Sequence, residues 1–383
     1  MTLFRNAMIY DRATRMFRRA DMLEKDGVIL AVGSFPAPDG AEVVDLTGAY
    51  LVPGLVDVHT HGRSGFDFNT APEDAYGTMM RDYALAGTTS VMPTLASDTF
   101  PHLIASAEAI RRQTGASRGK ASFIGLHLEG RYLSPVRRGA HAAELLANPD
   151  AAEFDDLRKA YPDAPLHVSL APELPGADDY IRRAVDGGAT VGVAHSDADF
   201  ETAEHAVSLG ASSFTHTFNA MRPVHHREPG DAIAALLTDS AYAEFIADGE
   251  HLHPAMLRLA VKTKSADKLV LITDSMEATG MPDGQYAIAG QPVVVKNGRA
   301  TSPDGKLAGS TLTLFRAVCN VMKFCSLPLE TVIPFATSNP AEMVGAGDVC
   351  GSLEIGKRCD FLVLRDKYEP VLEAVYAGGI PVV

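Results

Sequence analysis

Residues 53–62, PGLVDVHTHG, place His59 and His61 two positions apart at the end of an apolar run. Side chains of an extended strand alternate between its faces, so Asp57, His59 and His61 share one face and the residues between them take the other. Two neutral imidazoles on one face, about 7 Å apart along the strand, can chelate one divalent ion. The alternative is a pair of hydrogen-bonded polar residues at a strand end, so the rest of the chain decides between the two interpretations.

The sequence that follows this motif alternates strand-like and helix-like segments. Eight apolar β-type runs can be counted: VDVHTH, TSVMPT, SFIGLHLEG, LHVSLAPE, TVGVAHSD, SSFTHTF, AEFIADG and LVLITDS. Eight β/α units over about 290 residues predict an α/β fold of the (β/α)8 TIM-like barrel type rather than an open doubly wound sheet. After the eighth run we expect an inserted β-hairpin near residues 283–306, with Asn297-Gly298 as its turn.

The two ends of the chain differ from the middle. Residues 1–52 and 346–383 contain short β-like runs between turns, such as Asp26-Gly27. Neither end has enough apolar sequence to bury a core alone. We therefore predict that the two ends pair into one small β-sandwich domain, which flanks a barrel domain of residues 53–345.

Composition limits the classes of function. The chain has 383 residues, of which 46% are hydrophobic and 21% charged, as expected for a globular protein with a large core. We find no apolar run long enough for a bilayer and no secretory signal. The four cysteines form no Cys-x-x-Cys pair, which argues against a thiolate zinc site and favours a reducing cytoplasm. A net charge of -14 makes nucleic acid and anionic membranes poor partners, and an anionic substrate would need a local basic pocket.

Side chains that can bind a metal recur where the predicted strands end. There are six such positions: His59 and His61 on the first strand, Glu129 on the third, His195 on the fifth, His216 on the sixth and Asp274 on the eighth. Active sites of this barrel form at the carboxyl ends of its strands, so all six would meet at one mouth. A single strand-end histidine is more often structural, but the joint pattern predicts a metal centre. Histidine and carboxylate ligands suit Zn²⁺ or Fe²⁺.

Taken together, these segments resemble the amidohydrolase superfamily and, within it, the N-acetylglucosamine-6-phosphate deacetylase family. The resemblance covers nearly the whole chain and is carried by PGLVDVHTHG, GTTSVMPT, GLHLEG, GAH, LAPE, VAHSDA, THTFNAM, REPG, ADGEH, LITDSM, LAGS and GSLEIGKRCDFLVL. Many two-metal relatives use a carboxylated lysine on strand four, but here that strand reads LHVSLAPE and has no lysine. The resemblance implies hydrolysis of the acetamide of N-acetyl-D-glucosamine 6-phosphate, releasing acetate and D-glucosamine 6-phosphate.

The resemblance also implies a metal centre and an acid–base residue. The ligands of the main ion would be Glu129, His195 and His216. Because the chain keeps both His59 and His61, a second ion bridged by Glu129 is implied, which gives one or two divalent ions with Zn²⁺ as the first candidate and Fe²⁺ as the alternative. Metal-bound hydroxide would attack the amide, since ligation lowers the pKa of water from 15.7 to about 7. Asp274 would take the remaining proton and deliver it to the departing sugar nitrogen.

Further residues are implied to contact the substrate. His141, in RRGAH, would hydrogen-bond the acetamido carbonyl, and the alternative is a solvated loop histidine. Arg227, in REPG, and His251, in ADGEH, would bind the phosphate, with some contacts reaching across an interface, which implies a homodimer. Without the resemblance, a surface ion pair of Arg227 with Glu228 would be an equal alternative. The remaining implied contacts are Asn219, Ala220, Ala308, Gly309 and Ser310.

One departure from the family pattern concerns the sugar. Arg131 follows the Glu-Gly of the third strand, where the family has a smaller residue, and it would either contact the sugar or phosphate or turn outward to solvent. Galactosamine or mannosamine phosphates therefore stay open as substrates, as does an N-acyl-D-amino acid. A non-catalytic scaffold is disfavoured, because such relatives typically lose ligands or the acid–base residue and this chain has all six.

Overall fold

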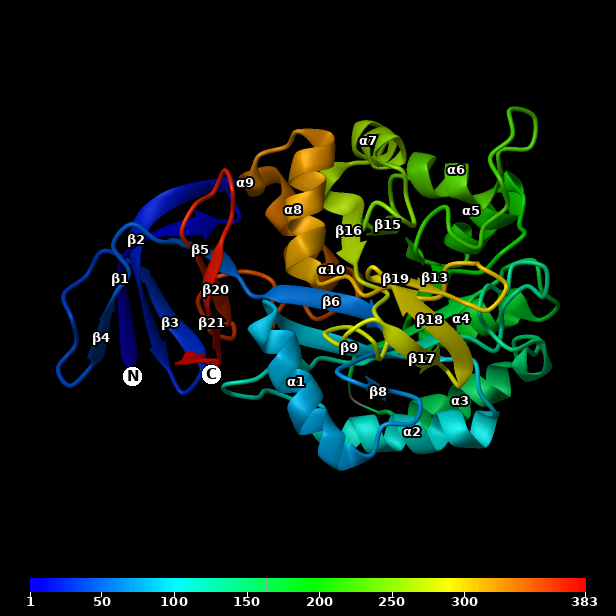
Figure 1. Cartoon of the computed structure of the whole chain (residues 1–383), viewed down its shortest axis with the longest axis horizontal. Coiled ribbons are helices and arrows are strands. Elements are labelled where there is room, and N and C mark those ends of the chain that lie inside the picture. The colour runs from blue at the N-terminus through cyan, green and yellow to red at the C-terminus, as the bar shows by residue number, and fades with distance from the viewer. Residues whose placement is uncertain (163) are drawn as a thin grey trace.

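Eight parallel strands form the centre of the molecule (Figure 1). The computed structural model describes residues 1–162 and 164–383. The barrel strands are β6 (Leu55–Thr60), β9 (Thr88–Ala96), β11 (Leu126–Glu129), β12 (Leu166–Leu170), β13 (Thr190–Val193), β14 (Ser213–Phe214), β15 (Tyr242–Ile246) and β16 (Leu269–Ile272), and the short β10 (Ser122–Phe123) pairs with β9. Each strand falls in one of the eight predicted runs, so the predicted barrel is confirmed.

The barrel closes between its last and first strands, next to the predicted site. Thr60, the last residue of β6, forms a parallel bridge with Ser275, which lies just beyond the end of β16. The Asp274 amide donates to the His59 carbonyl at 2.9 Å, and the His61 amide donates to the Ser275 carbonyl at 2.8 Å. The backbone that carries His59 and His61 is therefore hydrogen-bonded directly to the backbone that carries Asp274.

Helices connect the strands and cover the outside of the barrel. They are α1 (Tyr76–Leu85), α2 (Phe100–Gln113), α3 (Ala151–Ala160), α4 (Ala177–Asp186), α5 (Phe200–Ser208), α6 (Gly230–Leu237), α7 (Pro254–Thr263), α8 (Leu314–Cys325), α9 (Leu329–Val332) and α10 (Ser338–Met343). In α4 the buried positions Ala177, Tyr180, Ile181 and Ala184 repeat at helical spacing and form one apolar face. Asp199 caps α5, because its side chain accepts a hydrogen bond from the Thr202 amide at 2.8 Å.

Polar side chains fill the inside of the barrel beneath the mouth. The Ser169 and Thr215 hydroxyls lie 3.0 Å apart and come from β12 and from the end of β14, which are not neighbours in the sheet. In the same way His59 of β6 contacts Glu244 of β15 at 3.2 Å. Since these pairs span non-adjacent strands, the side chains must point into the barrel. A buried hydrogen-bonded layer thus lies directly below the predicted metal centre.

The predicted insertion forms a small sheet of three strands, β17 (Gly284–Ile288), β18 (Gln291–Lys296) and β19 (Arg299–Thr301). Lys296 pairs with Arg299, so Asn297 and Gly298 make the two-residue turn. Their φ angles of 53° and 73° match the left-handed turn that this dipeptide favours. The apolar face of the sheet packs against Met276 and Ala308, so the insertion lies beside the mouth of the barrel.

The two ends of the chain pair with each other as predicted. They contribute β1 (Thr2–Asp11), β2 (Met16–Lys25), β3 (Val28–Gly33), β4 (Glu42–Asp45), β5 (Tyr50–Pro53), β20 (Phe361–Leu364), β21 (Leu372–Ala377) and β22 (Ile380–Pro381) to one mixed sheet. β20 pairs antiparallel with β5, and the Phe4, Phe361 and Tyr376 rings pack in a separate apolar core. Figure 1 shows this sheet, in blue and red, on one side of the barrel. The proposed domain boundaries at residues 52 and 346 remain a prediction.

The remaining elements are short. They are the hairpin β7 (Gly62–Arg63) and β8 (Phe66–Asp67) and the 3-10 turns at Glu73–Ala75, Ala143–Leu145, Ala266–Lys268 and Ile333–Ala336. In the described part of the chain, no single helix has the length and apolar composition needed to span a membrane, and α8 with Leu329–Met343 passes that test only as a pair bent by 120°.

Candidate active site

A cavity of about 460 Å³ opens at the carboxyl ends of the barrel strands. Most of the candidate residues predicted from the sequence line it: His61, Glu129, His141, His195, His216, Asn219, Ala220, His251, Asp274, Ala308 and Gly309. The other three lie elsewhere, because His59 is fully buried beneath the cavity, Ser310 lies behind Asp274 and Arg227 is on an exposed loop. The structure therefore brings the strand-end residues together in one place.

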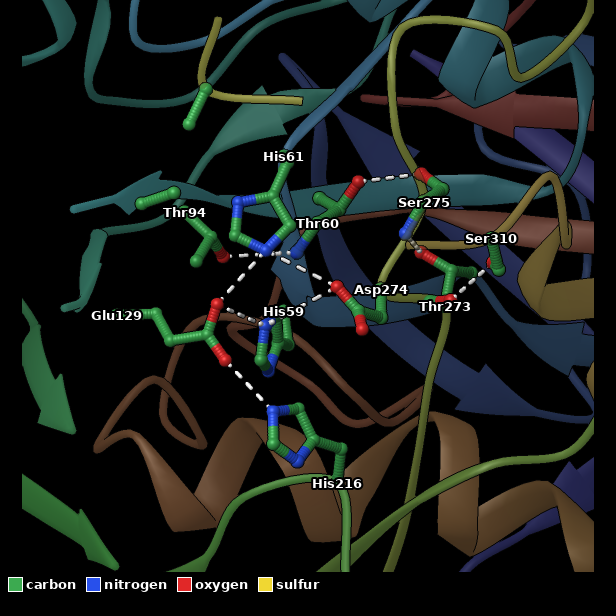
Figure 2. Close-up of polar contacts among 12 residues, drawn as sticks. His59, Thr60, His61, Thr94, Glu129, His216, Thr273, Asp274, Ser275 and Ser310 are labelled. Carbon is green, nitrogen blue, oxygen red and sulfur yellow. Dashed lines mark hydrogen bonds and ion pairs between the residues drawn. The ribbon is translucent and has the colours of Figure 1, made fainter. Parts of the chain in front are cut away.

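Glu129 lies at the centre of the cluster, at the last position of β11. One carboxylate oxygen, Oε1, is 2.9 Å from His216 Nε2 and 3.4 Å from His195 Nε2. The other, Oε2, is 3.0 Å from His61 Nε2 and 3.4 Å from His59 Nε2. Figure 2 shows Glu129 between His216 on one side and the β6 histidines on the other. Each oxygen thus faces its own pair of imidazoles.

The β6 pair follows the strand alternation that the sequence predicts. His59 and His61 point to the same side, and both present Nε2 to Glu129. The His59 ring is fixed from behind, since its Nδ1 lies 3.2 Å from Glu244 Oε2. A carboxylate can only accept, so Nδ1 carries a proton and Nε2 is the nitrogen that would bind a metal. Nε2 of His59 is buried and has no hydrogen-bond partner among the described residues.

His195 and His216 face Glu129 from a different backbone conformation. Both have left-handed φ angles, 45° and 31°, which side-chain-bearing residues rarely adopt. The predicted sixth strand, residues 212–218, accordingly ends at Phe214. His195 Nδ1 donates to the Arg137 carbonyl at 2.8 Å, so its Nε2 lone pair faces inward, where it lies 3.1 Å from His216 Nε2. Strained backbone at several functional positions is typical of a preorganised site.

Asp274 completes the cluster from the end of β16. Its φ is 48°, and its Oδ1 lies 3.1 Å from His61 Nε2 and 3.6 Å from His59 Nε2. Ser310 supports it from behind, since the Ser310 amide donates to the Asp274 carbonyl at 2.8 Å and its hydroxyl to the Thr273 carbonyl at 2.5 Å. The predicted substrate contact of Ser310 stays a prediction, while Ala308 and Gly309 line the cavity.

The clustered charges shift the pKa values of these groups. Burial raises the pKa of Asp274, but the hydrogen bond from His61 and the nearby His59 and His61 charges outweigh it and lower the pKa to about 2. Burial lowers the pKa of His61, but its hydrogen bonds to Asp274 and Glu129 raise it to about 9. For His141, burial and the neighbouring His195 lower the pKa to about 3. Asp274 is therefore a carboxylate and His141 a neutral imidazole at neutral pH.

The donor set fits one or two divalent ions. Two groups of three residues have candidate ligand atoms within 4.8 Å of one another: His59, His61 and Asp274 in one, and Glu129, His141 and His195 in the other. Imidazole nitrogen and carboxylate oxygen together suit Zn²⁺ and Fe²⁺. In the second group His141 stands where the sequence placed His216, although His216 is closer to Glu129, at 2.9 Å against 3.8 Å. Distance alone therefore leaves the role of His141 open.

On the phosphate side, the structure brings some predicted residues together and leaves one apart. His251 lines the cavity, and its Nδ1 lies 2.6 Å from Asp248 Oδ2. Asn219 also lines it, and its side chain donates to the His216 carbonyl at 3.1 Å. Arg227 is exposed and lies 2.8 Å from His226 Nε2, outside the cavity that the described residues of its own chain form. The structure thus places Arg227 apart from the other predicted phosphate contacts.

Arg131, the departure from the family pattern, turns away from the cavity. Its Nε lies 3.4 Å from Glu153 Oε2, and its guanidinium lies over the Phe100 ring at 5.8 Å. These partners belong to α3 and α2 on the outside of the barrel. The structure thus agrees with neither interpretation in full: the side chain faces away from the cavity, but it packs against α2 and α3 instead of lying in solvent and is only 18% exposed.

Sequence reasoning missed several residues at the cavity. Arg137, Arg138 and Lys306 line it and add positive charge to an acidic protein. The two arginines lie in the RRGAH segment, where only His141 was singled out, and a cation pair beside a predicted loop could have drawn attention to them. Glu244 was also missed, since it sits in the middle of the apolar run AEFIADG and looks like an isolated polar position.

Comparison with known proteins agrees with this geometry. The amidohydrolase family model matches residues 50–380. An N-acetylglucosamine-6-phosphate deacetylase from Vibrio furnissii is 36% identical over 93% of this chain and 89% of its own length. An N-acetylgalactosamine-6-phosphate deacetylase from Escherichia coli O157:H7 is 34% identical over 88% of this chain and 89% of its own.

Solved structures give the same result. An N-acetyl-D-glucosamine-6-phosphate deacetylase from Mycobacterium smegmatis, solved as a mutant in complex with N-acetyl-D-glucosamine-6-phosphate, superposes with a TM-score of 0.90 at 32% identity. The match covers 100% of this chain and 99% of that one. Fold, site geometry and sequence therefore lead to one conclusion: the chain belongs to the amidohydrolase family.

Proposed function

We propose that the protein hydrolyses the acetamide of N-acetyl-D-glucosamine 6-phosphate to D-glucosamine 6-phosphate and acetate. The observation that carries the proposal is the position of Glu129, with one oxygen facing each of two histidine pairs. Asp274 lies beside it at the floor of a cavity that also contains basic side chains. This arrangement suits an anionic amide substrate, and it is the substrate that related proteins of the family are named for.

Glu129, His195 and His216 would hold the main divalent ion. His59 and His61 would hold a second, with Glu129 shared between the two. Bound there, the metal would supply hydroxide at neutral pH and polarise the amide carbonyl. Zn²⁺ is the proposed metal, with Fe²⁺ as the alternative, because both accept nitrogen and carboxylate ligands.

The chain's own residues would move the protons. Asp274, whose Oδ1 lies 3.1 Å from His61 Nε2, accepts a proton from the attacking water. It then donates this proton to the sugar nitrogen, because an amide anion is too poor a leaving group. His141 lines the cavity as a neutral imidazole and donates a hydrogen bond to the acetamido oxygen as negative charge develops there.

The phosphate would be held at the other side of the cavity. His251, Asn219 and the Ala220 backbone are the proposed contacts within one chain. We propose a homodimer in which Arg227 of the second copy completes the site, because Arg227 lies on an exposed loop away from its own cavity. A guanidinium suits this role, since it binds phosphate oxygens in pairs. We propose the cytoplasm as the location.

The proposal is tested by acetate release from metal-stripped enzyme refilled with Zn²⁺ or Fe²⁺. Four substrates are compared: N-acetylglucosamine 6-phosphate, its galactosamine epimer and the two unphosphorylated sugars. Metal-dependent turnover of the phosphorylated glucosamine derivative, well above the other three, is expected. If metal is bound and none of the four is hydrolysed, the proposal fails.

A second candidate is deacetylation of N-acetylgalactosamine 6-phosphate. The observation that favours it is the 34% identity to the deacetylase of that name from Escherichia coli O157:H7. Arg131 gives it no support, because its side chain lies against Glu153 and Phe100 rather than in the cavity. The same four-substrate comparison separates the two, since the ratio of kcat/KM for the two epimers reports the difference in transition-state binding.

A further inference from the structure

His141 and Ser97 form a buried contact at the end of β9. His141 Nδ1 lies 2.9 Å from the Ser97 hydroxyl, and the Ser97 amide donates to the same nitrogen at 3.3 Å. The Ser97 hydroxyl in turn accepts from the Arg131 amide at 2.9 Å. Ser97 is 2% exposed and His141 7%, so water has little access to these groups.

Counting donors and acceptors assigns the proton on His141. If Nδ1 is unprotonated, its one lone pair is shared by the Ser97 amide and the Ser97 hydroxyl, whose oxygen remains free to accept from the Arg131 amide. If Nδ1 carried the proton, both the amide and the hydroxyl hydrogen of Ser97 would lose this acceptor. Buried donors are seldom left unpaired, because each costs about 1–3 kcal/mol. The first arrangement pairs all the groups involved.

We propose that Ser97 is a positioning residue that holds His141 in the tautomer with its proton on Nε2. In this state His141 presents a donor to the cavity and is not a metal ligand. The inference deepens the proposed function, on which it rests, by assigning how the donor to the acetamido oxygen is set. It also assigns His141 a role different from that of His216, which their distances to Glu129 alone did not do.

Two of the proposed metal ligands show the opposite arrangement. His195 Nδ1 contacts the Arg137 carbonyl at 2.8 Å, and His59 Nδ1 contacts the Glu244 carboxylate at 3.2 Å. Both partners accept, so in both rings the proton is on Nδ1 and the Nε2 lone pair faces Glu129, as a metal ligand requires. At His141 the partner donates, so the remaining nitrogen carries the proton. Among these three rings, the partner on Nδ1 thus distinguishes the two proposed ligands from the donor.

The local backbone leaves room for this contact. A Cβ on Gly130 would lie 2.5 Å from the Ser97 hydroxyl oxygen and 2.7 Å from its amide nitrogen, so only glycine permits this approach of β9 to β11. Asn69 fixes the end of β9 from the other side, because it exchanges two hydrogen bonds with the Ala96 backbone, each 3.0 Å long. Ser97 is thus held on a rigid strand end, as a positioning residue should be.

The direct test is the tautomer. Wild-type protein carrying ¹⁵N-labelled histidine is examined by NMR with and without Zn²⁺, and the His141 signals are assigned from their loss in His141→Gln. We expect an unprotonated Nδ1 and a protonated Nε2 in both states. A protonated Nδ1 would overturn the proposal. This readout needs no turnover, so it stands even if the enzyme proves inactive on the proposed substrate.

Variants of Ser97 give the second test. Ser97→Ala keeps the amide donor and loses the hydroxyl, so we expect a larger fraction of His141 with Nδ1 protonated. We expect kcat to fall about tenfold, while KM stays within about twofold and the metal content does not change. Ser97→Thr restores the hydroxyl and should recover kcat and the tautomer. The proposal fails if Ser97→Ala leaves both kcat and the tautomer of His141 unchanged. It also fails if His141→Gln loses bound metal as His195→Gln does.

Discussion

The floor and the rim of the cavity are built differently. The floor is the strand-end cluster His59, His61, Glu129, His195, His216 and Asp274, of which the most exposed, Asp274, is only 9% exposed. The rim cations are Arg137, Arg138, His251 and Lys306, which line the cavity, and we group with them Arg227, on an exposed loop outside it; all lie on segments between strands and helices. The Lys306 side chain is 72% exposed and paired with Asp304. The difference indicates that the proposed metal and acid–base residues are fixed by the barrel itself, whereas most of the cations lie on more exposed connecting segments.

The rim cations also have other partners within the chain. Arg137 contacts Asp197 Oδ1 at 2.7 Å, and Arg138 hydrogen-bonds the His141 carbonyl. A substrate phosphate would compete with such contacts rather than find free cations. Changes at the floor should therefore alter metal content and kcat, whereas changes at the rim should alter KM for phosphorylated substrates. The predictions that follow test this division.

The largest effect is expected at Asp274. Asp274→Asn keeps the size of the side chain but cannot take or deliver a proton, so we expect kcat to fall about 10³-fold. Metal content should stay within experimental error of wild type, because the residues proposed to hold the ions are unchanged. Steady-state kinetics with elemental analysis of the same sample checks both. Turnover at the wild-type rate would remove Asp274 from the acid–base role.

Glu244 is the next test of the floor. Its Oε2 accepts from His59 Nδ1 at 3.2 Å and from the His216 amide at 3.3 Å, so one carboxylate orients both sides of the cluster. Glu244→Leu should lower the affinity for divalent metal about 10- to 100-fold, since partners behind the ligands commonly contribute that much. Glu244→Gln, which keeps an acceptor oxygen, is the matched control and should lose less. Metal titration of the stripped proteins measures the difference, and equal affinities for Leu and wild type would contradict it.

The sequence predicted the positions of the floor residues but not their conformation. Period-two alternation and the end of an apolar run were enough to place His59, His61 and Glu129, because strand geometry leaves little choice. At His195, His216 and Asp274 the chain instead adopts left-handed backbone, with φ of 45°, 31° and 48°. Hydrogen bonds from other segments stabilise that conformation, and such long-range contacts cannot be predicted from a local sequence pattern.

The rim and the supporting residues were harder to predict for a related reason. Glu244 and Ser97 act through residues more than 40 positions away, His59 and His141, so only the folded chain reveals their roles. Arg227 was identified from its motif, yet a motif does not say whether its loop reaches the cavity, and in the structure Arg227 lies outside it. The barrel and the terminal sheet were predictable because they depend on apolar periodicity repeated over many residues.

At the rim, Arg227→Ala should raise KM for the phosphorylated sugar about tenfold, since a charged hydrogen bond to phosphate is lost. KM for unphosphorylated N-acetylglucosamine and kcat should change little. The matched control is Arg222→Ala, because Arg222 lies on the same loop but is 3.4 Å from Asp197. Sedimentation at the assay concentration checks whether the copies still associate. Equal changes in KM for both sugars would argue against a phosphate contact.

His251 should give a smaller effect that depends on pH. Burial lowers the pKa of His251, but the hydrogen bond and charge of Asp248 outweigh it, so the pKa lies above 6.5. A raised pKa means that the imidazolium, and its contribution to phosphate binding, is fully present below about pH 6.5 and is lost as the pH rises through the raised value. Asp248→Asn removes the partner, so KM for the phosphorylated sugar should begin to rise at lower pH, by a few-fold near neutrality. A KM profile that coincides with wild type would exclude His251 from phosphate binding.

The smallest effect on catalysis is expected at Arg131, which belongs to neither the floor nor the rim. Because its side chain lies against Glu153 and Phe100, Arg131→Ala should change the ratio of kcat/KM for the two epimers by less than about twofold. The free energy of unfolding should fall by about 1 kcal/mol as these contacts are lost. Arg131→Gly loses the same contacts but relieves the left-handed backbone at φ 54°, so it should be the more stable of the two variants. A clear change in the ratio of kcat/KM for the two epimers would mean that Arg131 reaches the sugar. Sugar selectivity would then depend on a residue that belongs to neither the floor nor the rim of the cavity.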